Sequence, residues 1–227
     1  GSLEPAVHGV YGVFSVQPPL LGQNNDEGYN AEQEVEQGKR LGDLAKAAGV
    51  KHFVYSSAGG ADRNSPLAHV NSKWQVEQYL RTLDLPLTVI YPVFFMENFN
   101  WNRQEIAGGH LTVALKPETR LQVVAVDDIG AFVALVFSHP DEYIGQGFEL
   151  AGDELTMPQA ASIFSQITGH PVDFAEQPLE QLASFSPEMA EMMQEFNLKP
   201  NQADIGDLRQ RHPGLMTLKQ WLQTSGW

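Results

Sequence analysis

The sequence contains no cysteine in its 227 residues. Disulfide bonds and thiolate metal sites are therefore excluded. This composition agrees with a reducing compartment, so we expect a cytoplasmic protein. The seven histidines show no pairing at the spacing of metal ligands, and no metal site is predicted.

Basic residues are also scarce, with 14 Lys and Arg against 28 Asp and Glu, which gives a net charge of −14. A surface that binds nucleic-acid phosphates needs clustered Lys and Arg, so direct nucleic-acid binding is not expected. Long apolar runs are absent too. No stretch reaches the roughly 20 residues of a membrane span, and we expect no membrane insertion.

The first half of the chain alternates apolar strands with amphipathic helices. Strands are predicted at 10–16, 52–57 and 85–92, and helices at 31–48 and 69–80. Strands and helices that alternate at this spacing form crossover connections and a parallel sheet. The prediction is an α/β fold whose sheet domain gives way to a mainly helical part near residue 150.

The second half is less regular. A strand is predicted at 121–128 and a helix at 129–138, with Asp127 and Asp128 as its caps. Further helices are predicted to begin at Thr156 and Thr217, each followed three residues later by a glutamine, and at Ser186.

The helix at 69–80 carries a lysine on its apolar stripe. Val76, Leu80 and Leu83 are spaced for one buried face, and the same spacing extends backwards to Lys73 and His69. A lysine on such a face is costly unless it is paired or lies at a wet edge. Either the stripe ends in a polar pocket, or the lysine reaches out to solvent at the start of the helix.

The position of this helix favours the pocket. A helix that follows a parallel strand begins at the carboxyl edge of the sheet, where open α/β folds bind ligands. The ends of three predicted strands converge there: Ser15–Gln17, Ser56–Ser57 and Pro92–Asn98. Gly38 and Gly42, four residues apart in the preceding helix, are expected to let that helix lie close on the sheet.

Five stretches of the chain carry a resemblance to a known family: "GVYGVFSVQ", "EVEQGKRLGDLAKAAGVKHFVYSS", "HVNSKWQVEQYLR", "YPVFFMENF" and "PDEYIGQGFELAGDELT". In this order they resemble the NmrA-like family, atypical members of the short-chain dehydrogenase/reductase superfamily. The resemblance implies a Rossmann-type fold that binds NADP(H). It assigns residues 1–150 to that domain and 151–227 to a smaller substrate or partner subdomain.

The sequence departs from the family in one large feature. The family opens with a strand, a Gly-rich turn and a helix, which cradle the pyrophosphate. No such stretch is present here, and "SAGGAD" at 57–62 lacks the G-x-G-x-x-G spacing. We therefore expect an N-terminally truncated sheet and weak or no NADP(H) binding by this chain alone. The strand at 10–16 would be an unprotected edge, so homo-oligomers or aggregates are expected.

The resemblance also implies site residues. Lys73 would hydrogen-bond the nicotinamide ribose. The other implied cofactor contacts are Val16, Gln17, Pro18, Ser56, Ser57, Phe95, Met96, Glu97 and Asn98. Ser56 and Ser57 could equally serve the turn, and the aromatic loop could equally be core.

One position bears on catalysis. In active short-chain dehydrogenases a tyrosine acts as general acid four residues before the lysine, and here that place is His69. A histidine could donate a proton near neutral pH, or it could simply be a polar residue at a helix end.

Two functions follow from the resemblance. The first is a cofactor-sensing regulator that signals through a protein partner with little or no turnover. The alternative is an NAD(P)H-dependent oxidoreductase acting on quinones or similar carbonyls. The histidine at the tyrosine position favours the first.

Overall fold

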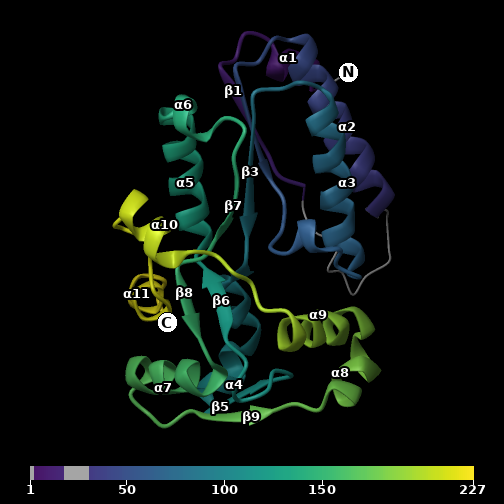
Figure 1. Ribbon diagram of the computed structural model, residues 1–227. Coiled ribbons are helices and arrows are strands. Elements are labelled where there is room, and N and C mark those ends of the chain that lie inside the picture. Colours follow the sequence, from purple (N-terminus) through teal and green to yellow (C-terminus); the bar gives the residue numbers. More distant parts are fainter. Residues whose placement is uncertain (1–2, 18–30) are drawn as a thin grey trace. The chain divides into compact units, whose positions relative to one another are not determined.

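The computed structural model describes residues 3–17 and 31–227 (Figure 1). The chain forms two compact units, which we call unit 1 and unit 2. Unit 1 comprises Gly1–Tyr91 and Ala131–Phe148, and unit 2 comprises Pro92–Gly130 and Glu149–Trp227. Residues 92–130 therefore group with the C-terminal residues, which differs from a single division near residue 150.

Unit 1 is built on a four-stranded sheet in the order β1 (Gly12–Ser15), β2 (His52–Ser56), β3 (Leu87–Pro92) and β7 (Gly147–Leu150). The first three strands pair in parallel. The backbone hydrogen bonds from Gly145 to Leu87 and from Val89 to Gln146 advance together, so β7 is parallel to β3 as well. The predicted α/β fold with a parallel sheet is confirmed.

Helices cover both faces of this sheet. In Figure 1, α2 (Ala31–Ala47) and α3 (Ala68–Thr82) lie side by side on one face, and α5 (Val126–Ser138) lies on the other. Every residue of β2 and β3 is consequently buried, as expected for strands covered on both sides. The short elements α1 (Glu4–Val7), η1 (Ala61–Arg63) and α6 (Pro140–Tyr143) complete unit 1.

The two glycines of α2 face a helix rather than the sheet, so the expectation that they would contact the sheet is wrong. A Cβ atom added to Gly38 would lie 2.6 Å from Cγ1 of Val76, and one added to Gly42 would meet Leu80. Both neighbours belong to α3. The small residues therefore let the two helices approach each other closely.

This close approach makes a prediction for Gly38→Ala. The added methyl group must displace Val76, and overpacking of this kind costs about 1–3 kcal/mol, whereas alanine gains about 1 kcal/mol in helix propensity. We expect a net loss of stability, measured by urea unfolding. Gly130→Ala is the matched control. Gly130 is exposed in α5 with no atom near its added Cβ, so alanine should stabilise the protein. Equal stabilisation by both changes would contradict the tight α2–α3 contact.

Unit 2 combines helices with two small sheets. One sheet has the order β4 (Phe94–Phe95), β6 (Leu121–Val124) and β8 (Asp153–Leu155), and the other pairs β5 (His110–Val113) with β9 (Asp173–Glu176). The helices of unit 2 are η2 (Met96–Asn102), α4 (Arg103–Ala107), α7 (Met157–Thr168), α8 (Leu179–Phe185), α9 (Pro187–Leu198), α10 (Ile205–Arg211) and α11 (Leu218–Thr224). The strands β4, β5 and β8 were not predicted, because runs of two to four residues are too short to show a period.

Three predicted helix starts are confirmed. Thr156 and Thr217 each form a capping box with the glutamine three residues later. The hydroxyl of Ser186 accepts a hydrogen bond from the backbone N–H of Met189 at the start of α9.

The predicted strand at 121–128 is too long. β6 ends at Val124, and α5 begins at Val126, whose N–H donates to the carboxylate of Glu97. Asp128 lies in the first turn, but its carboxylate accepts a hydrogen bond from the backbone N–H of Met216. The start of α5 is therefore stabilised by a carboxylate distant in sequence, which a local pattern does not reveal.

Candidate functional site

The candidate site lies at the carboxyl ends of β1 and β2 in unit 1. Ser15 pairs with Tyr55 in the parallel register, and the same register continued by two residues sets Gln17 opposite Ser57. Both side chains are buried. The ends of the first two predicted strands therefore meet as expected.

Lys73 points into this buried region and does not reach solvent. It is 5% exposed. Its ammonium group forms an ion pair with the carboxylate of Glu34 at 2.8 Å and donates to the backbone carbonyl of Gln17 at 2.9 Å. An ammonium group has three N–H donors, so one remains without a partner in the described part of the chain. Of the two alternatives for the stripe, extension of the lysine into solvent is not observed, and the stripe ends in a buried polar cluster.

Glu34 is the site residue that the sequence analysis missed. It lies in the first turn of α2 and is fully buried. One carboxylate oxygen accepts from Lys73, and the other accepts from the hydroxyl of Ser72 at 2.9 Å. A buried carboxylate needs such partners, because removing a charge from water is costly.

The sequence contains a spacing pattern that could have identified Glu34 as the partner of Lys73. Glu34, Gly38 and Gly42 follow one another at intervals of four on α2, so they share one face of the helix. On α3, Lys73 and Val76 lie on the facing stripe, and Val76 contacts Gly38. Aligning the two stripes would have set Glu34 opposite Lys73.

Two buried polar atoms near the strand ends lack partners. The hydroxyl of Ser57 and the Oε1 atom of Gln17 make no hydrogen bond among residues 3–17 and 31–227. The amide nitrogen of Gln17 donates to the hydroxyl of Ser15 at 2.9 Å. Because buried polar groups in folded proteins almost always have partners, these two atoms indicate a place where a polar ligand could bind.

The other residues predicted at this edge of the sheet differ in how far they are buried. Ser56 is buried at the end of β2, whereas Val16 is 56% exposed. Pro18 lies outside the described residues. His69 is half-buried in the first turn of α3, and its backbone carbonyl accepts from Ser72. The N-cap of this helix is Leu67, so His69 does not cap it.

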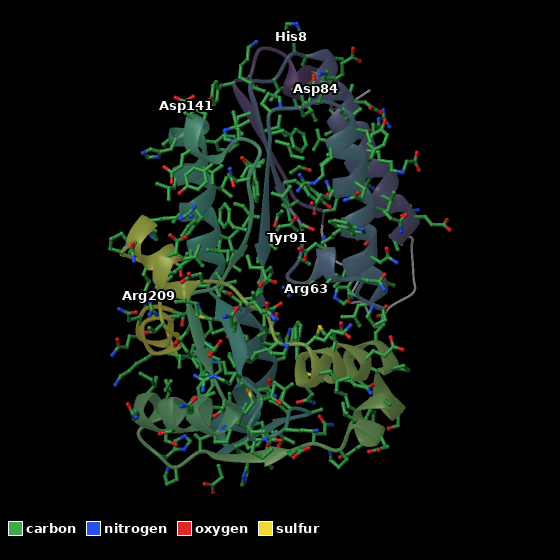
Figure 2. The ribbon with its side chains drawn as sticks, in the orientation of Figure 1. His8, Arg63, Asp84, Tyr91, Asp141 and Arg209 are labelled. Carbon is green, nitrogen blue, oxygen red and sulfur yellow. The ribbon has the colours of Figure 1, made fainter. Side chains whose placement is uncertain are left out.

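Tyr91 of β3 is the labelled tyrosine at the α3 side of the sheet (Figure 2). Its hydroxyl donates to the buried carboxylate of Glu77 at 2.8 Å, and Arg81 donates to the same oxygen. Burial first, and then the hydrogen bond to Glu77, raise the pKa of Tyr91 well above its usual value. Its phenol is therefore protonated at neutral pH and hydrogen-bonded to Glu77.

The predicted loop residues Phe95–Asn98 belong to unit 2. Met96 is fully buried, and Phe95 is half-buried. The carboxylate of Glu97 accepts from the N–H of Val126 and from the indole N–H of Trp221 at 3.1 Å. Glu97 therefore joins the first residue of α5 to α11, and both of these partners belong to unit 2. Asn98 lines a pocket of that unit.

None of the helices in the described ranges is both long and apolar enough to cross a membrane.

The model of the NmrA-like family matches residues 1–217. The chain belongs to the NmrA-like family. The resemblance carried by the five sequence stretches is thereby confirmed.

Two curated relatives illustrate the range of this NmrA-like family. An NmrA-like family domain-containing protein of Dictyostelium discoideum is 28% identical over 76% of this chain and 62% of its own length. The NAD(P)H azoreductase of Xenophilus azovorans is 29% identical over 79% of this chain and 59% of its own. The chain thus spans about 60% of the length of these curated relatives.

The fold is shared with solved NmrA-like structures. NmrA, a negative transcriptional regulator crystallised with NADP, superposes with a TM-score of 0.74 at 19% identity, covering 98% of this chain and 76% of that one. The predicted Rossmann-type fold is confirmed.

Proposed function

We propose that this NmrA-like chain belongs to an NADP(H)-binding, redox-sensing regulator with little or no turnover. The observation that carries the proposal is the buried polar cluster at the ends of β1 and β2, in which Ser57, Gln17 and Lys73 each keep hydrogen-bonding capacity unused in the described residues. The solved NmrA, a transcriptional regulator bound to NADP, supports it.

The buried polar cluster fits the ribose of the cofactor better than its pyrophosphate. The hydroxyl of Ser57 and the third N–H of Lys73 are donors that ribose oxygens could accept, and Oε1 of Gln17 can accept from a hydroxyl. For the pyrophosphate, the sequence offers no strand followed by a G-x-G-x-x-G turn and a helix. We therefore expect ribose contacts without the pyrophosphate cradle, and a low affinity for this chain alone.

We expect low turnover because of the two groups that would take part in proton transfer, His69 and Lys73. His69 takes the place of the tyrosine acid, and the ammonium group of Lys73 is held by Glu34. A lysine fixed in a buried ion pair is poorly placed to lower the pKa of a neighbouring acid. The role of His69 as a general acid thus stays a prediction, with sensing favoured over catalysis.

NADPH titration followed by amide NMR shifts tests the proposal. We expect weak binding, with shifts at Gln17 and Ser57, and a several-fold loss of affinity in Ser57→Ala. This change removes an unpartnered hydroxyl, so stability should be kept. Absence of any shift at millimolar NADPH would overturn cofactor binding. Micromolar affinity would contradict the expected lack of a pyrophosphate site.

The second candidate function is an NAD(P)H-dependent oxidoreductase of quinones or similar carbonyls. The relative named as an NAD(P)H azoreductase favours it. NADPH oxidation with a quinone, compared between the wild type and His69→Ala, distinguishes the two. A robust wild-type rate that His69→Ala abolishes would replace the sensor proposal with the enzyme.

The proposal also includes a protein partner and self-association through β1. It includes a cytoplasmic location, which the lack of cysteine favours. Among the described strands, β1 pairs only with β2 and is the edge of its sheet. Its surroundings expose apolar side chains: Val10, Tyr11, Phe14 and Val16.

An exposed apolar edge invites pairing with another chain. We therefore expect dimers or larger species in sedimentation analysis at high concentration. Val16→Lys introduces a charge on this edge and should shift the population towards monomers. A wild-type protein that stays monomeric at high concentration would remove self-association from the proposal.

A further inference from the structure

Unit 1 contains a fully buried histidine, His52, at the start of β2. It lies at the opposite end of this strand from Ser56, and so away from the buried polar cluster. Its ring packs edge to face against Phe137 of α5, with ring centroids 5.3 Å apart. The proposed function gives this titratable side chain no role.

A chain of hydrogen bonds determines which nitrogen of His52 carries the hydrogen. Nε2 lies 2.8 Å from the hydroxyl oxygen of Thr88 in β3, and that hydroxyl donates to the backbone carbonyl of Tyr143 in α6 at 2.7 Å. A hydroxyl has one hydrogen and a carbonyl can only accept, so Nε2 must donate to Thr88. In neutral His52 the other ring nitrogen, Nδ1, is therefore unprotonated.

The Nδ1 atom is buried and has no hydrogen-bond partner among residues 3–17 and 31–227. Protonation would add an N–H group and a positive charge there, and no acceptor in the described residues faces it. A buried charge without a partner is costly. The fold therefore accommodates the neutral ring, and it does so through the hydrogen bonds that join β2 to β3 and α6.

The elements around His52 offer no buried carboxylate to balance such a charge. β3 carries no titratable side chain from Leu87 to Ile90. On or beside β1, β2, α5 and α6 the titratable residues are Tyr11, Lys51, His139, Asp141, Glu142 and Tyr143, all of them exposed except Tyr143. Burial, rather than any charged neighbour, lowers the pKa of His52 below its ordinary value of about 6.5.

We propose that His52 acts as a pH-sensitive switch for unit 1, holding β2, β3 and α6 together when neutral and loosening them when protonated in mild acid. In the unfolded chain a histidine takes up its proton near pH 6.5. The stabilisation is thus complete above that pH and is lost as the pH falls below it, towards the lower pKa of the folded state. This switch goes beyond the proposed cofactor sensing and does not depend on it.

NMR of the histidine ring nitrogens between pH 8 and pH 5 tests the switch in the wild-type chain. We expect His52 to be in the Nε2–H form at neutral pH and to remain neutral while His8 becomes protonated. His8 is exposed and is labelled in Figure 2, so it reports an ordinary histidine of the same unit. An Nδ1–H form of His52, or protonation of His52 together with His8, would contradict the proposal.

His52→Gln separates protonation from hydrogen bonding. Its amide offers an N–H donor to Thr88 but takes up no proton in this pH range. Urea unfolding followed through the amide signals of β2 reports unit 1 itself. Below about pH 6.5 the equilibrium constant for unfolding should rise up to about tenfold more per pH unit in the wild type than in this variant, because the unfolded wild type binds one additional proton.

His8→Gln is the matched control, since it removes an exposed histidine of the same unit and should keep the pH dependence of the wild type. A pH dependence in His52→Gln as steep as that of the wild type would also reject the switch. If His52→Gln does not fold, the ring titration of the wild type decides alone. Neither experiment contains a cofactor, so both outcomes are independent of NADPH binding.

Discussion

Lys73→Ala should destabilise unit 1 by about 3–5 kcal/mol, the cost of leaving one member of a buried ion pair without its partner. Glu34 is fully buried, and the ammonium group at 2.8 Å is its charged partner. Removing that group leaves a carboxylate whose one remaining partner among the described residues is the hydroxyl of Ser72. Chemical denaturation of the wild type and the variant measures the loss.

A double-mutant comparison sharpens this result. Glu34→Leu combined with Lys73→Met replaces both charges by apolar groups of similar size and should be far less destabilising than either single truncation. Lys46→Ala is the control. Its ion pair with Asp84 is exposed, so the loss should be below about 1 kcal/mol. A Lys73→Ala loss no larger than that of the control would show that the Glu34–Lys73 pair is not desolvated as the structure has it.

This expectation changes how cofactor binding must be tested. A lysine that reached solvent at the start of the helix would tolerate truncation. Since Lys73 is buried and paired, a loss of NADPH affinity in Lys73→Ala would combine damage to the fold with loss of a contact. Ser57, whose hydroxyl has no partner in the described chain, is the cleaner position.

Gly152→Ala should destabilise unit 2 by about 2–4 kcal/mol. An added methyl group would overlap the backbone carbonyl of Met216. That backbone is held on both sides, because the N–H of Met216 donates to Asp128 at 3.0 Å and the N–H of Leu218 donates to Asp153 at 3.0 Å. Moving Met216 away breaks at least one of these bonds.

Hydrogen exchange would locate the loss of stability in Gly152→Ala. The amides of α10 and α11 should lose protection first in Gly152→Ala, because Arg209 also donates to the carbonyl of Gly152 at 2.7 Å. Gly130→Ala, in the same unit but with open space around its Cβ, should leave this protection unchanged. Retained protection of α10 and α11 at wild-type stability would contradict the prediction.

Local sequence patterns were sufficient for several features. The alternation of strands and helices predicted the parallel sheet of unit 1, and the threonine–glutamine spacings predicted two helix starts. The collinear stretches predicted the NmrA-like family. Each of these signals lies within a short window, where helix period, strand period and capping act on neighbouring residues.

Only the tertiary structure decided which polar groups pair. Glu34 and Lys73 are 39 residues apart, and Glu97 reaches Val126 and Trp221 across 29 and 124 residues. The sequence by itself determined that a lysine stands on a buried stripe at the ligand edge of an α/β sheet. Whether that lysine is paired depends on which carboxylate the packing of α2 against α3 brings within reach. Glycines at 38 and 42 permit that packing, and the cost of burying an unpaired charge then makes the ion pair necessary.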